Sequence, residues 1–400
     1  INFSIAKNMN ALIKSNPQKY YMNIICNLLY YLGVGNFWYE KREETNKQKW
    51  LYRIWMVISN GYVVSFAGNL FLANIRSDLD KEEANDASLF SYAFFSIIFK
   101  IIFSYIQRNR IIIVLERLLE GNRSFVDDEV DKACVKRFLR LSVTAIGVTY
   151  LSLVGHTING IKSHITDGIP IRTEVTYYPR PSHSGFLVNV LRFFIQLHWW
   201  YIVTIMCLID GLCICSLVIV GYKFVSLQVF FERMRKKLEE IAVTKDGRNP
   251  ANEYINDFVE GIRMHEDALW CAKNVQYALG NLYSVQIFES TALLIMCLVK
   301  LVTQERSITF LIANVPYIAC LFLLTGSYMM AGGDITYEAS RLHTSIFHSG
   351  WELIPEARLR TLAVVALQRS QVPVYMFAFG ILILNYGNFI TVSYLYKLRY

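Results

Sequence analysis

The stretch VLRFFIQLHWWYIVTIMCLIDGLCICSLVIVG, which runs from residue 190 to residue 221, decides the fold. Its formally charged side chains are Arg192 and Asp210, and most of the others are aliphatic or aromatic. About 20 apolar residues in a row allow an α-helix to cross the hydrocarbon core of a bilayer. We therefore predict that this stretch is a membrane-spanning helix.

The composition of the whole chain agrees with a membrane protein. Of its 400 residues, 54% are hydrophobic, 14% are aromatic and 18% are charged, and the mean hydropathy is +0.30. A soluble domain of this length is usually more polar. The formal net charge is +8, but the basic residues lie mostly between the apolar stretches and do not alternate with aromatic ones. No nucleic-acid partner is therefore predicted.

Seven apolar stretches are long enough to cross a bilayer. They are residues 51–73, 87–106, 138–159, 190–221, 283–303, 307–330 and 373–396. The prediction is an all-α polytopic membrane protein with its two ends on opposite sides. Residues 20–38 are shorter and rich in aromatic side chains, which favours an interfacial or re-entrant helix over an eighth span.

The positive charges predict the orientation. About 28 Lys and Arg residues lie in the connections on one side of the predicted membrane and about 10 on the other, and the richer side is normally cytoplasmic. The N-terminus is therefore predicted to be inside. No outer loop contains a cysteine, so an extracellular disulfide scaffold is not expected. Cys213 and Cys215 should point to different sides of their helix and should not share a metal ion.

Spans four and five are predicted to continue as helices into the cytoplasm, because residues 224–280 keep apolar side chains at helical spacing. Another amphipathic helix should precede Pro373. Together these helices would form an anchor bundle below the membrane. The predicted division is an N-terminal segment 1–50, spans one to four 51–221, the extensions 222–283, spans five and six 284–330, an anchor helix 331–372 and a last helix 373–400.

The sequence contains no catalytic or metal-binding motif such as HExxH, GxSxG or a phosphate-binding loop. No enzyme activity, cofactor or metal is predicted. The charged residues inside predicted spans include Lys100, Asp210 and Glu289. Charges at these positions indicate either a salt-bridge network between helices or a coupling-ion site of a transporter, and the network is the favoured interpretation.

Aromatic side chains gather in the outer halves of several spans and can line an apolar cavity or belong to the interfacial aromatic belt. The predicted ligand-binding residues are Phe90, Tyr92, Phe94, Phe95, Tyr150, His156, His198, Trp199, Ile202, Phe310 and Tyr317. In the last span Asn385, Asn388 and Thr391 lie near one helix face. Such a polar stripe lines either a pore built by several subunits or a contact with another helix.

The C-terminal part resembles a known family. SRLHTSIFHSGWELIPEARLRTLAVVALQRSQVPVYMFAFG, residues 340–380, followed by FITVSYLYKL, residues 389–398, is similar to the C-terminal signature of insect odorant receptors. The similar positions are Ser340, Trp351, Arg358, Gln371, Pro373, Gly380, Phe389, Ser393 and Tyr394. Length, predicted topology and the extended spans also agree with this resemblance.

The resemblance implies an odorant-gated, non-selective cation channel in the plasma membrane of olfactory sensory neurons. It implies four subunits around a pore, with an odorant-tuned chain such as this one assembling with the shared co-receptor. The anchor would include Trp351, Arg358, Gln371 and Pro373. The gate would lie near Val392, Leu395 and Leu398, where Lys397 and Arg399 depart from an apolar ending.

Three other classes remain as alternatives. A gustatory receptor would be expected to end in a TYxxxxxQF-like motif, which this chain lacks. A G-protein-coupled receptor would place its N-terminus outside and would usually carry an outer disulfide. A secondary transporter would show inverted repeats and broken helices, and the two halves of this sequence are not similar.

Overall fold

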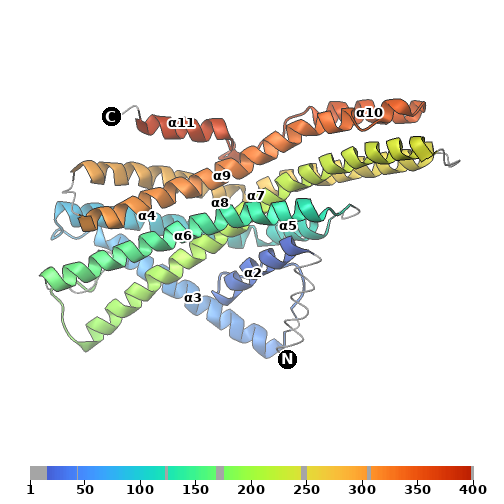
Figure 1. Ribbon diagram of the computed structural model, residues 1–400. Helices are drawn as coiled ribbons and strands as arrows, with labels where there is room; N and C mark the ends of the chain where they lie inside the picture. The colour runs from blue at the N-terminus through green and yellow to red at the C-terminus, as the bar shows by residue number, and fades with distance from the viewer. Residues whose placement is uncertain are drawn as a thin grey trace.

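The computed structural model describes residues 16–42, 44–121, 125–167, 175–244, 250–303 and 308–397. These residues form a bundle of long helices with one small hairpin (Figure 1). The helices are α2 Pro17–Tyr31, α3 Asn46–Ala73, α4 Lys81–Ile106, α5 Arg108–Glu120, α6 Asp128–Asp167, α7 Phe186–Thr244, α8 Pro250–Thr303, α9 Ile308–Phe347, η1 Trp351–Leu353, α10 Ala357–Ser370 and α11 Tyr386–Lys397. The hairpin pairs β1 Phe377–Ala378 with β2 Leu382–Ile383.

Within the described residues, six helices are long and apolar enough to cross a membrane, and they correspond to α3, α4, α6, α7, α8 and α9. The all-α polytopic fold predicted from the sequence is confirmed. Helix α7 lies at the centre of the bundle. Of its most apolar 18-residue segment, 89% is buried inside the protein, compared with 28% for the corresponding segment of α3. A helix that is apolar on every side is stable only when other helices or lipid surround it.

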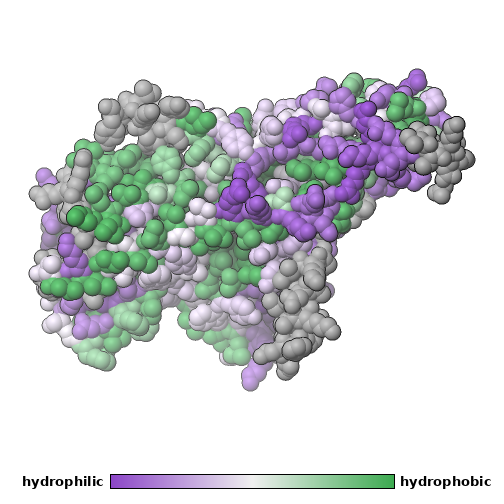
Figure 2. All heavy atoms as spheres, viewed as in Figure 1, coloured by the Kyte–Doolittle hydropathy of each residue, from purple (hydrophilic) through white to green (hydrophobic). Residues whose placement is uncertain are grey.

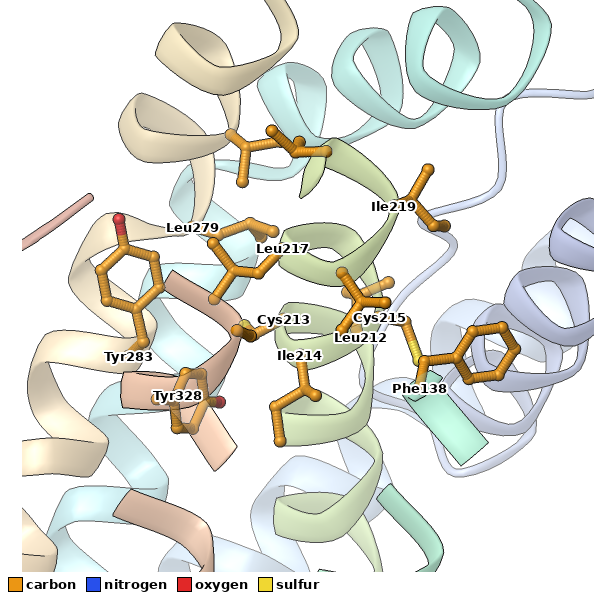
Figure 3. Close-up of a cluster of buried hydrophobic side chains, with 14 of the residues drawn as sticks. Phe138, Leu212, Cys213, Ile214, Cys215, Leu217, Ile219, Leu279, Tyr283 and Tyr328 are labelled. Carbon is orange, nitrogen blue, oxygen red and sulfur yellow. The ribbon is translucent and has the colours of Figure 1, made fainter. Parts of the chain in front are cut away.

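The centre of the core lies around α7 (Figure 3). On one side of α7, Cys213 and Leu217 face Tyr283 of α8 and Tyr328 of α9. Cys215 points the other way, toward α6. The two cysteines therefore diverge, as the sequence predicts, because residues two apart on a helix are about 200° apart around its axis.

The predicted helical extensions are present. Helices α7 and α8 have 59 and 54 residues and run on together beyond the rest of the bundle, with α10 nearby (Figure 1). Apolar side chains hold this extension together, since Leu227, Phe231 and Phe258 are fully buried. Hydrophilic residues gather on the surface of the extension, whereas hydrophobic residues dominate the visible face of the bundle (Figure 2). This change from a hydrophobic to a hydrophilic surface is expected where helices pass from a bilayer into water.

The prediction of one helix over 373–396 is wrong in its first half. Residues 371–385 instead contain the β1–β2 hairpin, which turns at Phe379 and Gly380 with φ of 54° and 71°. Gln276 of α8 fixes the hairpin by donating to the Phe377 carbonyl and accepting from the Phe377 amide, both at 2.8 Å. The backbone amide and carbonyl of Phe377, which make no helical hydrogen bonds, are thus paired by the side chain of Gln276. The last helix, α11, begins at Tyr386.

Candidate functional site

A cavity of about 50 Å³ lies among α4, α6, α7, α8 and α9. One water molecule needs roughly 10–15 Å³ by this measure, so the cavity holds a few waters or a very small ligand. Ligand pockets for drug-sized molecules are usually about 300–1,000 Å³. A larger ligand can therefore enter only if the surrounding helices or side chains move.

Each helix presents one face to the cavity, because its lining residues are spaced three, four or seven apart. The lining residues are Ala93 and Ile97 of α4, Thr149, Ser152, Leu153 and His156 of α6, Trp199, Val203 and Met206 of α7, Gln286 and Glu289 of α8, and Tyr317, Cys320, Leu321 and Leu324 of α9. The wall is mainly apolar, with a few polar groups. This combination is typical of sites that bind small organic molecules.

Two polar atoms at the cavity have no hydrogen-bond partner among the described residues, namely Nε2 of His156 and Nε1 of Trp199. Oε2 of Glu289 also makes no hydrogen bond there, but it pairs with the Lys100 ammonium at 3.6 Å. A buried polar atom without a partner costs free energy, typically about 1–3 kcal/mol. A ligand or water that supplies the missing hydrogen bond would recover this cost, so the cavity favours a mainly apolar molecule with a hydrogen-bonding group.

Three of the predicted ligand-binding residues line the cavity, namely His156, Trp199 and Tyr317. Phe90 and Phe94 form a second layer behind them. The Phe90 ring lies 5.2 Å from the ring of Trp199, and that of Phe94 lies 4.7 Å from it. These two phenylalanines fix the position of the indole.

The other predicted aromatic residues lie elsewhere. Phe95 is 53% exposed on the outside of α4, because it stands one residue beyond the face that carries Phe94. Tyr92 packs near Phe288 at 6.3 Å. Tyr150 shares a hydrogen bond of 2.6 Å with the hydroxyl of Thr204, away from the cavity.

His198 and Ile202 are fully buried on a face of α7 that does not line the cavity. The His198 ring packs against Tyr62, 5.1 Å away, and Phe94, 5.4 Å away. The side chain of Phe310 lies outside the described residues.

Most of the small and polar lining residues, such as Ala93, Ser152 and Gln286, are not among the residues predicted from the sequence. Aromatic side chains do not indicate these positions, because small residues shape a cavity by leaving space. The available signal was the combination of Thr149, Ser152 and His156 on one face of an otherwise apolar helix.

A buried charge cluster adjoins the cavity through Gln286 and Glu289, which line it. The Lys100 ammonium donates to both oxygens of Asp210, at 3.0 and 3.1 Å, and also to Oε1 of Gln286. It lies 3.6 Å from Oε2 of Glu289. The Tyr328 hydroxyl donates to Oδ1 of Asp210 at 2.8 Å. Lys100, Asp210 and Glu289 therefore form one cluster with Tyr328, and this cluster joins α4, α7, α8 and α9.

The predicted anchor residues lie around α10. Trp351 is half-buried in η1, and Arg358, Gln371 and Pro373 are exposed. Several apolar side chains of the same region are also exposed, including Leu353 at 59% and Val365 at 57%. An exposed apolar surface outside the membrane region is typical of a contact with another subunit.

The predicted pore residues begin at the start of α11. Oδ1 of Asn385 accepts from the Asn388 amide at 2.7 Å, so Asn385 caps the helix instead of lying inside it. Asn388 donates to the Ile383 carbonyl at 2.8 Å, and Thr391 is exposed. Leu398 and the side chains of Val392 and Leu395 lie outside the described residues.

Within the described residues, no group of three or more His, Cys, Asp or Glu side chains could hold a metal ion. The long apolar helices and the small, mainly apolar cavity between them define the class as a multi-pass membrane protein with a site that suits small molecules. The sequence pattern of the 7tm Odorant receptor family matches residues 80–394, and the chain belongs to this family. Its members are receptors and not enzymes.

The fold is similar to that of an insect olfactory receptor whose structure has been solved. Insect olfactory receptor OR5 from Machilis hrabei in complex with eugenol has a TM-score of 0.78 at 11% identity, with 94% of this chain and 95% of that chain covered. A second structure of OR5 from Machilis hrabei has a TM-score of 0.76 at 12% identity, with the same coverage. No curated protein matches the sequence. At these identities the likeness shows the fold.

Proposed function

We propose that the chain is the odorant-tuned subunit of an odorant-gated, non-selective cation channel. The observation that carries this proposal is the mainly apolar cavity between the helices, where the His156 imidazole and the Trp199 indole each have a buried nitrogen without a hydrogen-bond partner among the described residues. It favours small volatile molecules that are mostly apolar and have a hydrogen-bonding group. Insect olfactory receptor OR5, which has the same fold, was solved in complex with eugenol.

The mechanism is a shift of population between a closed and an open state. A ligand shifts such an equilibrium only by binding the two states with different affinities. Because the cavity of about 50 Å³ is too small for most odorants, a bound odorant favours the state with separated helices. Helix α9 lines the cavity and also contacts α11. The ring centroids of Phe322 on α9 and Phe389 on α11 lie 6.4 Å apart. Opening would widen a pore lined by α11 from each subunit.

The chain is proposed to lie in the plasma membrane of olfactory sensory neurons with its N-terminus in the cytoplasm and to form a heterotetramer with the co-receptor. The distribution of Lys and Arg supports the orientation. The exposed Leu353 and Val365 support assembly through the extension. Staining of terminal tags on unpermeabilised cells tests the orientation: only the C-terminal tag should be labelled.

Current recording tests the function. Cells that express this chain with the co-receptor should conduct cations when an odorant panel is applied, and cells that express this chain alone should not. The variant Tyr317→Ala should change the concentration of odorant that gives half-maximal current. The matched control is Phe95→Ala, which removes an aromatic side chain from the outer face of α4 and should leave that concentration unchanged. Current that requires a G protein, or equal effects of the two variants, would contradict the proposal.

A further inference from the structure

A second and larger cavity, of about 330 Å³, lies far from the ligand cavity, where the loop after α2 meets the start of α3 and the junction of α4 and α5. Its walls come from residues that are distant in the sequence, including Asn36, Tyr52 and Arg108. This volume falls within the range of ligand pockets, about 300–1,000 Å³.

The walls of this cavity are fixed by specific contacts. The rings of Tyr30 and Tyr52 stack with centroids 3.9 Å apart and an interplanar angle of 9°. Nε of Arg108 donates to the Asn36 carbonyl at 2.7 Å. Nε1 of Trp55 donates to the carbonyl of Tyr31 at 2.9 Å, which holds the end of α2 against α3. Residues of three parts of the chain that are distant in sequence are therefore held together at this cavity by specific contacts.

The cavity is positively charged. Lys49, Arg53 and Arg108 line it, whereas Glu44 is the acidic lining residue. Glu44 already accepts a hydrogen bond of 2.7 Å from the Tyr30 hydroxyl. Lys49 and Arg53 are exposed and stand four residues apart on one face of α3, and neither pairs with a carboxylate in the described part of the chain. The three basic lining residues outnumber the one acidic lining residue, and this excess of positive charge favours an anionic ligand.

A polar atom inside the cavity also lacks a partner. The hydroxyl of Tyr52 is buried and makes no hydrogen bond with any residue that the structure describes. A phosphate oxygen could accept a hydrogen bond from it while pairing with the cations. Phosphate offers several acceptor oxygens, and Arg side chains recognise it well.

The surroundings of the cavity indicate a lipid and not a soluble anion. Trp50 is 61% exposed and Ile54 is 36% exposed on the first turns of α3, and Ile102 and Ile106 are 46% and 67% exposed on the end of α4. Tryptophan next to apolar side chains is typical of the membrane interface. Acyl chains could lie on these apolar faces while the headgroup enters the cavity.

We propose that this cavity binds the phosphate headgroup of an anionic phospholipid from the inner leaflet, with Lys49 and Arg53 as its main cationic contacts. Basic pockets between helices on the cytoplasmic side suit such headgroups. The choice of leaflet rests on the proposed orientation, and the site itself is independent of odorant binding. A bound lipid would fix α2 and the first turns of α3 and α4 relative to one another.

Native mass spectrometry of the purified full chain tests this site. The chain is titrated with short-chain phosphatidylinositol 4-phosphate, with short-chain phosphatidylcholine and, separately, with soluble inositol phosphate. The anionic lipid should bind more tightly than the other two. The double variant Lys49→Gln and Arg53→Gln should bind it roughly 30-fold more weakly. The variant Lys49→Arg with Arg53→Lys keeps both charges and should retain binding.

The matched control is Lys41→Gln with Lys47→Gln, which removes the same charge from exposed positions near the same cavity. It should bind the lipid as the unchanged chain does. If the control and the Lys49→Gln, Arg53→Gln variant weaken lipid binding equally, the lipid is attracted by the general surface charge, and the proposed site is wrong. Equal binding of the soluble inositol phosphate would overturn the assignment to a lipid. Melting curves of the variants distinguish lost binding from lost folding.

Discussion

The Tyr386 hydroxyl at the start of α11 donates a hydrogen bond to Oδ1 of Asp334 on α9. The other oxygen of the same carboxylate pairs with Arg137 of α6 at 2.8 Å. Helix α6 also carries part of the ligand cavity, including Ser152 and His156. One carboxylate therefore connects a cavity-lining helix with the helix that we propose to line the pore.

If this connection transmits gating, Tyr386→Phe should weaken it without changing the cavity. We expect the concentration of odorant for half-maximal current to change by roughly fivefold, the effect of a hydrogen bond worth about 1 kcal/mol. Dose–response currents with the co-receptor measure it. Tyr337→Phe is the matched control, because Tyr337 is an exposed tyrosine of α9 outside this connection. A Tyr386→Phe response identical to that of the unchanged chain would exclude the role in gating.

Gly332 of α9 allows the hairpin to approach closely. A Cβ atom at this position would lie 2.4 Å from Cβ of Leu384, which is fully buried. We expect Gly332→Ala to lower the free energy of unfolding by about 1–3 kcal/mol because both backbones must shift. Gly68→Ala is the control, since a Cβ atom there meets nothing within 4 Å. Melting temperatures in detergent compare the two variants. Equal melting temperatures would show that the close contact of Gly332 with Leu384 is not required for stability.

The charge cluster gives a prediction about folding. Asp210→Asn leaves the Lys100 ammonium buried with a weaker partner, and breaking a buried ion pair in this way typically costs about 3–5 kcal/mol. We expect a strong loss of folded protein, measured by fluorescence-detected size-exclusion chromatography. Replacing the whole cluster with Lys100→Met, Asp210→Leu and Glu289→Gln should recover part of the yield, since no unpaired buried charge remains. Normal yield of Asp210→Asn with altered ion selectivity would favour a coupling-ion site instead.

The sequence predicted the long helices well because hydropathy alone defines them. The run 190–221 has few polar residues, and α7 contains all of it. The error at 373–396 has the same origin. This stretch is apolar enough to cross a membrane, but hydropathy does not record that Phe379 and Gly380 turn with positive φ. The partner that fixes the turn, Gln276, lies about 100 residues earlier in the chain.

The cavity was harder to predict because it depends on how five helices are rotated relative to one another. His156, Trp199 and Tyr317 were found because they are large and unusual in an apolar helix. Phe95 and Tyr150 look equally suitable in the sequence, but the packing turns them away. Helix rotation is set by contacts between distant residues, such as the salt bridge of 3.0 Å between Lys100 and Asp210.

His265 in the extension of α8 predicts a dependence of stability on pH. Burial, with a smaller effect from the Arg369 charge, lowers the pKa of His265 from 6.5 to about 4. Between these two pH values the unfolded chain binds the proton more readily, so stability falls as the pH decreases from 6.5 to 4. The loss at pH 4 should approach about 3 kcal/mol. His265→Gln should make the melting temperature less sensitive to acid, and an unchanged pH profile would exclude His265 as the cause.

The ligand cavity can be tested by filling it. Ser152 lines the cavity on α6 and is 4% exposed, so Ser152→Leu would occupy space that a ligand needs. We expect the odorant response to be lost while surface expression remains. Val154→Leu is the matched control, because Val154 is 41% exposed on the outer face of the same helix. Odorant currents and surface labelling, recorded for both variants in cells that also express the co-receptor, separate loss of binding from loss of folding. If Ser152→Leu retains the full odorant response at normal potency, odorants bind elsewhere, because a cavity of about 50 Å³ cannot accept both the added side chain and a ligand.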